Sequence, residues 1–139
     1  MSDPAMPNPS VGDWVPEHSQ GPISRATLAL FAGASNDHIA LHIDSDFAKA
    51  AGMPDVFAHG MLSLAYVAQL LTRWIPQERL RSWSARFTAI TPLHATVTCR
   101  GQVIELFEEQ GERRARVKLF AVTDQGVKTI EAEAVVAVA

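Results

Sequence analysis

The chain has 139 residues, enough for one domain with a hydrophobic core. Hydrophobic residues make up 47% of it and charged residues 19%, which is the balance of an ordinary soluble globular protein. The net charge of −3 offers no basic surface to nucleic acid or anionic lipid, and the single cysteine, Cys99, excludes an intrachain disulfide. Nucleic-acid binding and a disulfide-stapled fold are therefore not expected.

The N-terminal sequence, MSDPAMPNPS, lacks the basic start and the apolar run of a signal peptide. Its three prolines and its missing periodicity predict a flexible tail over residues 1–10, followed by one domain over residues 11–139. The most apolar segment, residues 61–74, is too short to cross a bilayer and contains Gln69 and Arg73. We therefore expect a cytoplasmic protein with no membrane partner.

The first half of the chain is mainly helical in pattern. A first strand is expected to begin within residues 12–15, and Ser24 is a suitable N-cap for a helix that runs through Phe31. A short helix is expected between residues 45 and 52, with an aspartate at its start and a glycine beyond its end. The segment 60–74, GMLSLAYVAQLLTRW, predicts a third helix that is apolar on nearly every face and therefore buried on most sides.

After Pro76 the hydrophobic pattern changes to a period of two. Strands are expected over residues 81–90, 96–107, 114–119 and 130–138, with turns at 109–111 and 124–126. Because these turns are short and contain glycine, the strands that they join should pair antiparallel. The sequence thus predicts an α+β domain in which a curved antiparallel sheet of three or four strands wraps around the long central helix. One such sheet cannot cover the whole helix, so a second subunit is expected to share its burial.

Residues 36–44, NDHIALHID, hold two acids and two of the chain's five histidines. Asp37 and His42 are five positions apart, a spacing that separates them in a helix and sends them to opposite faces of a strand. They can act together only in an irregular loop, which Ile39–Leu41 would pack inward. A carboxylate and an imidazole that converge beside apolar walls can hold one water molecule and move its protons near neutral pH. The alternative is a set of polar turn residues at a helix C-terminus.

A metal site is a further hypothesis for the same segment. His38 and His42 would share one face of a helix, as zinc-binding pairs do. Asp37, Asp44 or His59 would then supply the third ligand. No cysteine lies nearby and the ligand set is unspecific, so no metal is expected. Asp44 is instead expected to support the short helix that follows it.

Gly60 opens the apolar helix and leaves a free N–H at the helix N-terminus, where the dipole favours developing negative charge. Such a donor can act as an oxyanion hole for a carbonyl. The alternative is that Gly60 only lets the helix pack closely against the sheet. Cys99 alternates with Val97 on one strand face, so we interpret it as a packed core thiol and not as a nucleophile. The sequence contains no Walker loop, nucleophile elbow or dinucleotide fingerprint.

Together these segments resemble the MaoC-like enoyl-CoA hydratases, a branch of the hotdog fold. That family has a stretch S-x-D-x-N-P-x-H, a short A-K-x-A-G-type helix and then A-H-G-M-L. Residues 35–42 here are SNDHIALH and residues 47–62 are FAKAAGMPDVFAHGML, while residues 85–93, ARFTAITPL, are similar to the family's R-F-x-x-P-V strand. The resemblance extends from about Gly12 to the C-terminus. The chain departs from the pattern at Ile39-Ala40, where the family has Asn-Pro, and at His94-Ala95, where it often has Gly-Asp.

The resemblance implies a single hotdog domain with an Asp37–His42 dyad. In the family the dyad holds the water that adds across the 2,3 double bond of a trans-2-enoyl-CoA, giving a (3R)-3-hydroxyacyl-CoA, and the reverse dehydration uses the same groups. Gly60 would polarise the thioester carbonyl through its N–H. The implied activity is that of a hydro-lyase in fatty acid or lipid metabolism, with no cofactor apart from the coenzyme A of the substrate.

Four further residues are weaker candidates for substrate binding. They are His59, Met61, Phe87 and Arg86. Arg79, Arg81 and Arg86 are the candidates for contacts with the coenzyme A phosphates. The expected partner is a second hotdog subunit, in a homodimer or a heteromer. Two alternatives stay open: a non-catalytic acyl-CoA-binding subunit of a heteromeric hydratase, which Ile39-Ala40 favours, and an acyl-CoA thioesterase on the same fold.

Overall fold

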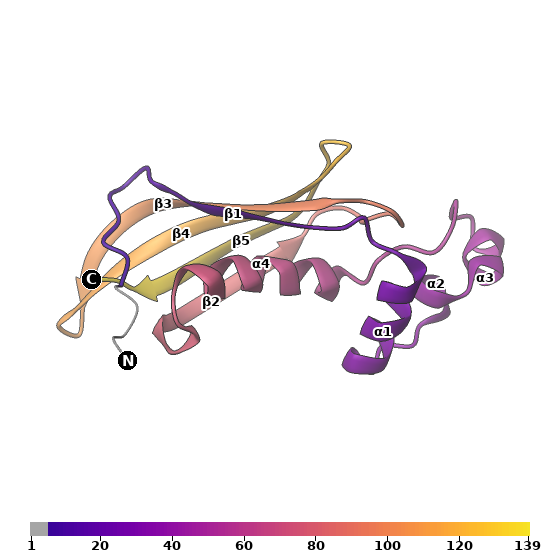
Figure 1. Ribbon diagram of the computed structural model, residues 1–139, viewed down its shortest axis with the longest axis horizontal. Helices are drawn as coiled ribbons and strands as arrows, with labels where there is room; N and C mark the ends of the chain where they lie inside the picture. The colour runs from indigo at the N-terminus through magenta and orange to yellow at the C-terminus, as the bar shows by residue number, and fades with distance from the viewer. Residues whose placement is uncertain (1–5) are drawn as a thin grey trace.

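The computed structural model describes residues 6–139 and contains one five-stranded antiparallel sheet with a long helix, α4, lying along its concave face (Figure 1). In chain order the elements are β1 (Trp14–Gln20), α1 (Arg25–Ser35), α2 (Ala40–Ile43), α3 (Ser45–Ala50), α4 (Gly60–Trp74), a 3₁₀ turn (Gln77–Arg79), β2 (Leu80–Phe87), β3 (Val97–Glu109), β4 (Glu112–Thr123) and β5 (Lys128–Ala137). The helices α1, α2 and α3 gather at one end of the sheet, beyond the N-terminus of α4 (Figure 1). The α+β hotdog prediction is confirmed.

The hydrophobic core lies between α4 and the sheet. From α4 it takes Leu62, Tyr66, Val67, Leu70 and Leu71, and from β4 it takes the alternate residues Ala115, Val117, Leu119 and Ala121, all buried. The approach is closest at Gly101 on β3, where an added Cβ would lie 2.8 Å from Leu119 Cδ2 and 3.4 Å from Leu70 Cδ2. Glycine at this position therefore lets α4 settle onto the sheet.

The helical predictions are confirmed in outline. Ser24 caps α1, since its Oγ accepts a hydrogen bond from the Thr27 N–H at 3.1 Å. Asn36 ends the helix in the left-handed region, with φ of 58°. The four-residue helix α2 was not predicted, because a single turn is too short to show a helical repeat.

The first strand and the four strands expected after Pro76 are all present, but their order along the sheet was not predicted. The sheet has five, in the order β1-β3-β4-β5-β2. The β3–β4 and β4–β5 hairpins are antiparallel, as the short turns predicted. β1 is a full edge strand beside β3, and β2 pairs with β5 at the opposite edge, so residues 88–96 cross from that edge to β3, past β5 and β4. The hydrophobic pattern of the sequence does not show which strands far apart in the chain pair with each other.

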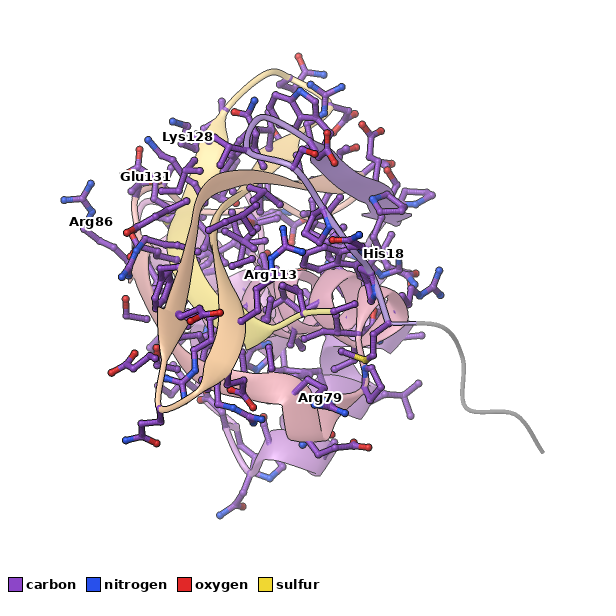
Figure 2. The ribbon with its side chains drawn as sticks, turned by 90° about the vertical axis from the view of Figure 1, so that its left-hand side faces the viewer. His18, Arg79, Arg86, Arg113, Lys128 and Glu131 are labelled. Carbon is purple, nitrogen blue, oxygen red and sulfur yellow. The ribbon has the colours of Figure 1, made fainter. Side chains whose placement is uncertain are left out.

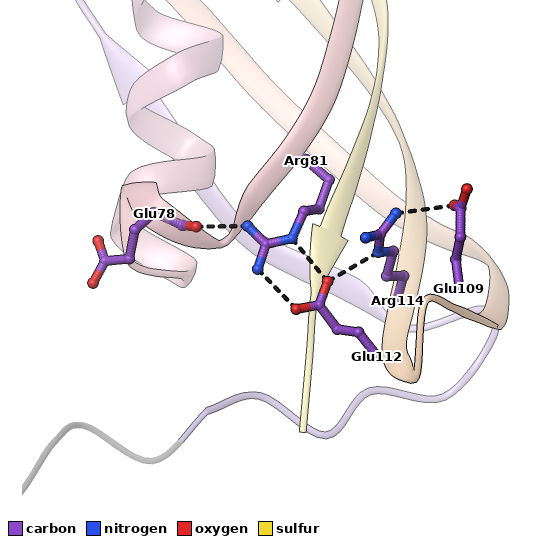
Figure 3. Close-up of polar contacts among 5 residues, drawn as sticks. All are labelled: Glu78, Arg81, Glu109, Glu112 and Arg114. Carbon is purple, nitrogen blue, oxygen red and sulfur yellow. Dashed lines mark hydrogen bonds and ion pairs between the residues drawn. The ribbon is translucent and has the colours of Figure 1, made fainter.

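The β2 edge is held at one end by an ion-pair network (Figure 3). The guanidinium of Arg81 donates to both carboxylate oxygens of Glu112 at 2.8 Å and to the Glu78 carbonyl at 2.7 Å. Arg114 donates to the same Glu112 and to Glu109, each at 2.9 Å. Arg81, followed by Arg114, lowers the pKa of Glu112 to about 2, so this carboxylate stays charged over the ordinary pH range.

Pro7 and Asn8, near the start of the described residues, lie beside the C-terminus at the sheet end opposite the short helices. The expected flexible tail falls partly on residues 1–5, which lie outside the described residues. The Ala139 N–H donates to the Pro7 carbonyl at 2.9 Å, and Arg113 donates to Asn8 and to the Ala139 carbonyl (Figure 2). Within residues 6–139, no helix has the length and apolar character needed to cross a membrane.

The free edge of β2 is the most open part of the domain. Every residue from Arg81 to Phe87 is exposed, including the aromatic rings of Trp83 and Phe87. The neighbouring start of α4 is also open, with Met61 55% exposed. An unpaired strand edge flanked by apolar side chains is a surface on which another chain can add.

Candidate active site

The turn between α1 and α2 brings Asp37 to one end of α4. Asn36 reverses the chain through its left-handed conformation, and the Ser35 hydroxyl donates to the Phe31 carbonyl at 2.7 Å. Asp37 Oδ1 then accepts from the Ile39 N–H at 3.4 Å. These local contacts turn the chain into α2, whose third residue is His42. The segment therefore combines an irregular turn with a single helical turn.

A second segment, Phe57–His59, runs beside this turn immediately before α4. His42 Nδ1 lies 2.7 Å from the Phe57 carbonyl oxygen, and the Phe57 N–H donates to the Leu41 carbonyl at 3.4 Å. His59 Nε2 lies 3.0 Å from the main-chain oxygen of Asp37. Three hydrogen bonds thus tie the α1–α2 connection to the start of α4.

This pairing brings Asp37, His42 and His59 together. One carboxylate oxygen and one ring nitrogen from each histidine all lie within 4.8 Å of one another. Asp37 is partly buried, His42 is 9% exposed and His59 is 1% exposed. Because the Phe57 carbonyl can only accept, Nδ1 of His42 carries the proton in the neutral ring, which leaves Nε2 with its lone pair. The arrangement offers a carboxylate and a free base at one point.

His59 is the most deeply buried residue of this cluster. Its ring stacks on the ring of His42, with centroids 4.0 Å apart and an interplanar angle of 27°. The ring of Phe31 meets it edge-on at 4.9 Å. Burial is the main cause that lowers the pKa of His59 below its ordinary value, and the neighbouring His42 adds to this, while the hydrogen bond to the Asp37 carbonyl opposes it.

This cluster is not the His38–His42 pair whose spacing suggested a possible metal site. His38 is exposed and is not one of the three converging groups. The three groups that converge are Asp37, His42 and His59, so of the pair considered from spacing only His42 takes part. Asp44 caps α3 as expected, accepting from the Asp46 and Phe47 N–H groups at 3.0 and 3.2 Å.

Gly60 is the first residue of α4, so its N–H has no acceptor within the helix. An added Cβ would lie 3.0 Å from two ring carbons of Phe87. The close neighbour of Gly60 is therefore an aromatic ring from β2, and the glycine leaves the helix N-terminus uncovered by a side chain of its own.

An apolar groove begins at Asp37 and follows α4. Its first part, of about 410 Å³, is lined by Phe31, Ser35, Asp37, Met61, Leu64, Ala65, Ala68 and Trp83. A second cavity of about 240 Å³ shares Ala68 and Trp83 with it and continues to Leu71, Ile75 and Leu80. Ala68 of α4 and Trp83 of β2 line both cavities, so the cavities adjoin at these two residues.

The remaining candidates are dispersed. Met61 lines the groove, whereas His59 is enclosed by other side chains and is not part of the lining. Arg86 forms an ion pair with Glu131, which also binds Lys128, at a distance from the groove (Figure 2). Arg81 is engaged by Glu112.

Two features of the site escaped the sequence analysis. The Phe57 carbonyl, which fixes the ring of His42, is a main-chain group, and no side-chain pattern identifies such an acceptor. Ile39 was expected to pack inward, but it is 56% exposed. The turn is held by the hydrogen bonds of its main chain to residues 57–59 and not by packing of this side chain.

Comparisons with known proteins agree on one family. A sequence model described as "MaoC like domain" matches residues 9–126. An (R)-specific enoyl-CoA hydratase of Rhodospirillum rubrum is 31% identical over 118 residues, which cover 84% of this chain and 80% of the relative. The (R)-hydratase from A. caviae involved in PHA biosynthesis has a similar structure, with a TM-score of 0.81 and 26% identity over 94% of this chain and 97% of that one.

A second solved structure shows the same fold in an assembly. The ChsH1–ChsH2 complex from Mycobacterium tuberculosis gives a TM-score of 0.79 at 22% identity and covers 94% of this chain and 98% of that one. At this identity the likeness concerns the fold alone.

We expect Ala40→Pro to stabilise the protein. Ile39 has φ of −59° and ψ of 130°, the conformation that a residue before proline adopts, and Ala40 is the first residue of α2, where proline fits without loss of a hydrogen bond. The free energy of unfolding should rise by about 0.4–1 kcal/mol, measured by urea denaturation. Leu41→Pro, one position further into the turn, is the control and should destabilise. A lower midpoint for Ala40→Pro than for the parent would contradict the prediction.

A second prediction concerns the pH dependence of stability. Because the pKa of His59 is lowered in the folded state, the unfolded chain takes up this proton first as the pH falls below about 6.5. The free energy of unfolding should therefore fall on acidification, by at most about 1.4 kcal/mol per pH unit from this group. His59→Gln should show a weaker fall between pH 7.5 and 5.5 in urea denaturation, whereas His38→Gln should keep it. Equal slopes for all three proteins would exclude this role of His59.

Proposed function

The chain belongs to the MaoC-like domain family, and from this premise we propose that it catalyses the (R)-specific hydration of a trans-2-enoyl-CoA to a (3R)-3-hydroxyacyl-CoA, or the reverse dehydration. One observation carries the proposal: Asp37, a carboxylate that lines an apolar groove, lies in one cluster with His42, an imidazole with a free Nε2. The N-terminus of α4, at Gly60, lies in the same region. These are the groups that addition of water to a conjugated thioester requires.

His42 is suited to take the proton of the attacking water. Its Nδ1–H is already bonded to the Phe57 carbonyl, so the ring is held in one orientation. When Nε2 takes up a proton, the Nδ1–H of the imidazolium keeps this carbonyl as its acceptor. As the water O–H bond breaks, the oxygen bonds to C3 and the electrons of the double bond move toward the thioester oxygen. Asp37 orients the water, and its carboxylate relays to C2 the proton that His42 has taken, which restores the carbonyl and returns both residues to their starting protonation states.

The Gly60 N–H is the proposed donor to the thioester oxygen. Negative charge develops there as the enolate forms, and the first N–H groups of a helix are fixed donors in the positive end of its dipole. α4 is a 15-residue helix packed on the sheet, so this donor is rigidly placed before substrate arrives. Hydration transfers no net electrons, and the proposal includes no cofactor beyond the coenzyme A of the substrate.

The groove along α4 is the proposed acyl site. Its walls are almost entirely apolar, and only Asp37 at its mouth carries a charge. Ala65 and Ala68 leave space against the helix, while Trp83 closes the first cavity from the second. A short or medium acyl chain fits the first cavity without displacing this ring.

A second hotdog subunit is the proposed partner. The exposed β2 edge and the open side of α4 supply an apolar surface that a lone domain leaves in water. Complexes exist on this fold, as the ChsH1–ChsH2 structure illustrates. Homodimer and heteromer both bury this surface.

A non-catalytic subunit of a heteromeric hydratase is the second candidate function. It is favoured by Ile39-Ala40 at the place of the family's Asn-Pro, since Ile39 provides no side-chain hydrogen bond at the start of α2. This subunit would bind acyl-CoA without turning it over alone.

The proposal predicts that the purified protein consumes trans-2-enoyl-CoA, seen as loss of the ultraviolet absorbance of the conjugated thioester. His42→Ala and Asp37→Asn should each lower kcat by about 10²–10⁴-fold, because each removes a proton-transfer group. His38→Ala, an exposed neighbour, is the control and should retain activity. Undiminished turnover by His42→Ala would overturn the assignment. Turnover that appears only with a co-purified second hotdog chain would instead support the non-catalytic subunit.

The groove predicts a change of chain-length preference in Trp83→Ala. Removing the ring joins the cavities of about 410 and 240 Å³, so a longer acyl chain can extend past Ala68. The ratio of kcat/KM for a ten-carbon over a four-carbon enoyl-CoA should rise at least about tenfold, which corresponds to about two newly buried methylenes at about 0.8 kcal/mol each. Trp14→Ala removes an exposed tryptophan that packs on Phe120 and should leave the ratio unchanged. An unchanged ratio in Trp83→Ala would place the acyl chain elsewhere.

A further inference from the structure

His59 is a buried titratable residue that the proposed reaction does not use. It is 1% exposed and lies between Phe31 of α1 and His42 of α2. Its Nε2 is 3.0 Å from the Asp37 carbonyl, an atom that can only accept, so Nε2 carries the proton. Its Nδ1 is buried and has no hydrogen-bond partner within residues 6–139. A second proton on this ring would be a buried N–H without an acceptor, so His59 stays neutral.

His42 is held in the opposite tautomer. Its Nδ1–H faces the Phe57 carbonyl and its Nε2 keeps the lone pair. The two rings lie in face contact, at 4.0 Å between centroids. Two stacked imidazolium ions would repel each other, so a neutral ring at His59 is the compatible neighbour for the proposed base, His42.

His59 also touches both halves of the dyad by different means. It holds Asp37 through a hydrogen bond to the main chain, and it holds His42 through the face of its ring. The next residue in the chain is Gly60, the start of α4. His59 therefore connects the main chain of Asp37, the ring of His42 and the start of α4. The ionisable groups that face it are Asp37 and His42, while α1 contributes only the apolar ring of Phe31.

We propose that His59 is a positioning residue that sets the geometry of the Asp37–His42 dyad, with Nε2–H fixing the main chain of Asp37 and the ring face fixing the plane of the His42 imidazole. This inference rests on the proposed hydratase function for its kinetic consequence. It assigns His59 no contact with substrate, because the side chain is enclosed and does not line the groove.

Two substitutions separate the two contacts. His59→Phe keeps a flat ring against His42 and removes the N–H that binds Asp37. His59→Gln keeps an amide donor near the position of Nε2 and removes the ring face. If both contacts position the dyad, each variant lowers kcat by about 10–100-fold and changes KM by less than about threefold, since the groove is untouched.

His18→Gln is the matched control. His18 is also a buried histidine, 4% exposed, and its Nε2 bonds to Gln69 Oε1 at 2.8 Å, about 15 Å along α4 from Gly60 (Figure 2). Its replacement should reduce stability and leave kcat within about twofold. A loss of kcat in His18→Gln equal to that in the His59 variants would reduce the effect to general destabilisation and overturn the proposal. Circular dichroism and the thermal midpoint identify any variant that does not fold.

Nitrogen NMR of the imidazoles tests the same proposal without substrate. In the parent protein His42 should show a protonated Nδ1 and His59 a protonated Nε2. His59→Gln should give averaged His42 ring signals, and His59→Phe should keep the His42 signals but shift the amide of His38, which shares the peptide plane of the Asp37 carbonyl. Unchanged signals in both variants would overturn the positioning role. Should the parent hydrate no enoyl-CoA, the proposed function fails and these spectra still decide the role of His59.

Discussion

The packing of α4 into the concave face of the sheet is the constraint on which the site depends. The helix is fixed along its length by buried side chains and by the close approach at Gly101. Its N-terminus therefore has a defined position, and the residues that precede it, Phe57–His59, enter from a fixed direction. The α1–α2 turn is then aligned on those residues by three hydrogen bonds. Core packing thus determines indirectly, through residues 57–59, where Asp37 and His42 lie next to each other.

The same packing leaves one side of α4 uncovered. The sheet has five strands, and β2, its last strand at that edge, is exposed along its whole length from Arg81 to Phe87. A groove with apolar walls remains between the helix and this strand, and Asp37 is part of its lining. A lone α+β domain of this size does not close around its own helix, so both this groove and an unpaired strand edge remain open.

Local patterns in the sequence predicted the elements but not all of their partners. The period of two and the glycine turns gave the β3–β4 and β4–β5 hairpins, and the apolar run gave α4, because these signals lie within one element or its nearest neighbour. The pairing of β2 with β5 depends on contacts about fifty residues apart, and the one-turn helix α2 shows no repeat. Both are decided by tertiary packing, which periodicity does not encode.

In the candidate site, too, the sequence indicated one part and not the other: it indicated the residues, but not the main-chain groups that hold them. Family resemblance indicated Asp37, His42 and Gly60 because they are side-chain identities at fixed spacing, and the structure brings the first two together. It did not indicate how they are held, because the acceptors are the carbonyls of Phe57 and Asp37.

These main-chain hydrogen bonds also explain how the turn keeps its conformation with Ile39-Ala40 in place of Asn-Pro. Proline presets the backbone of a turn when local sequence must do so, whereas here Ile39 adopts the pre-proline conformation without it. Hydrogen bonds to a segment anchored by α4 impose that conformation from outside the turn. The position of Asp37 beside His42 is thus a property of the fold around them, because hydrogen bonds to residues 57–59 hold the turn with Ile39 and Ala40 in it.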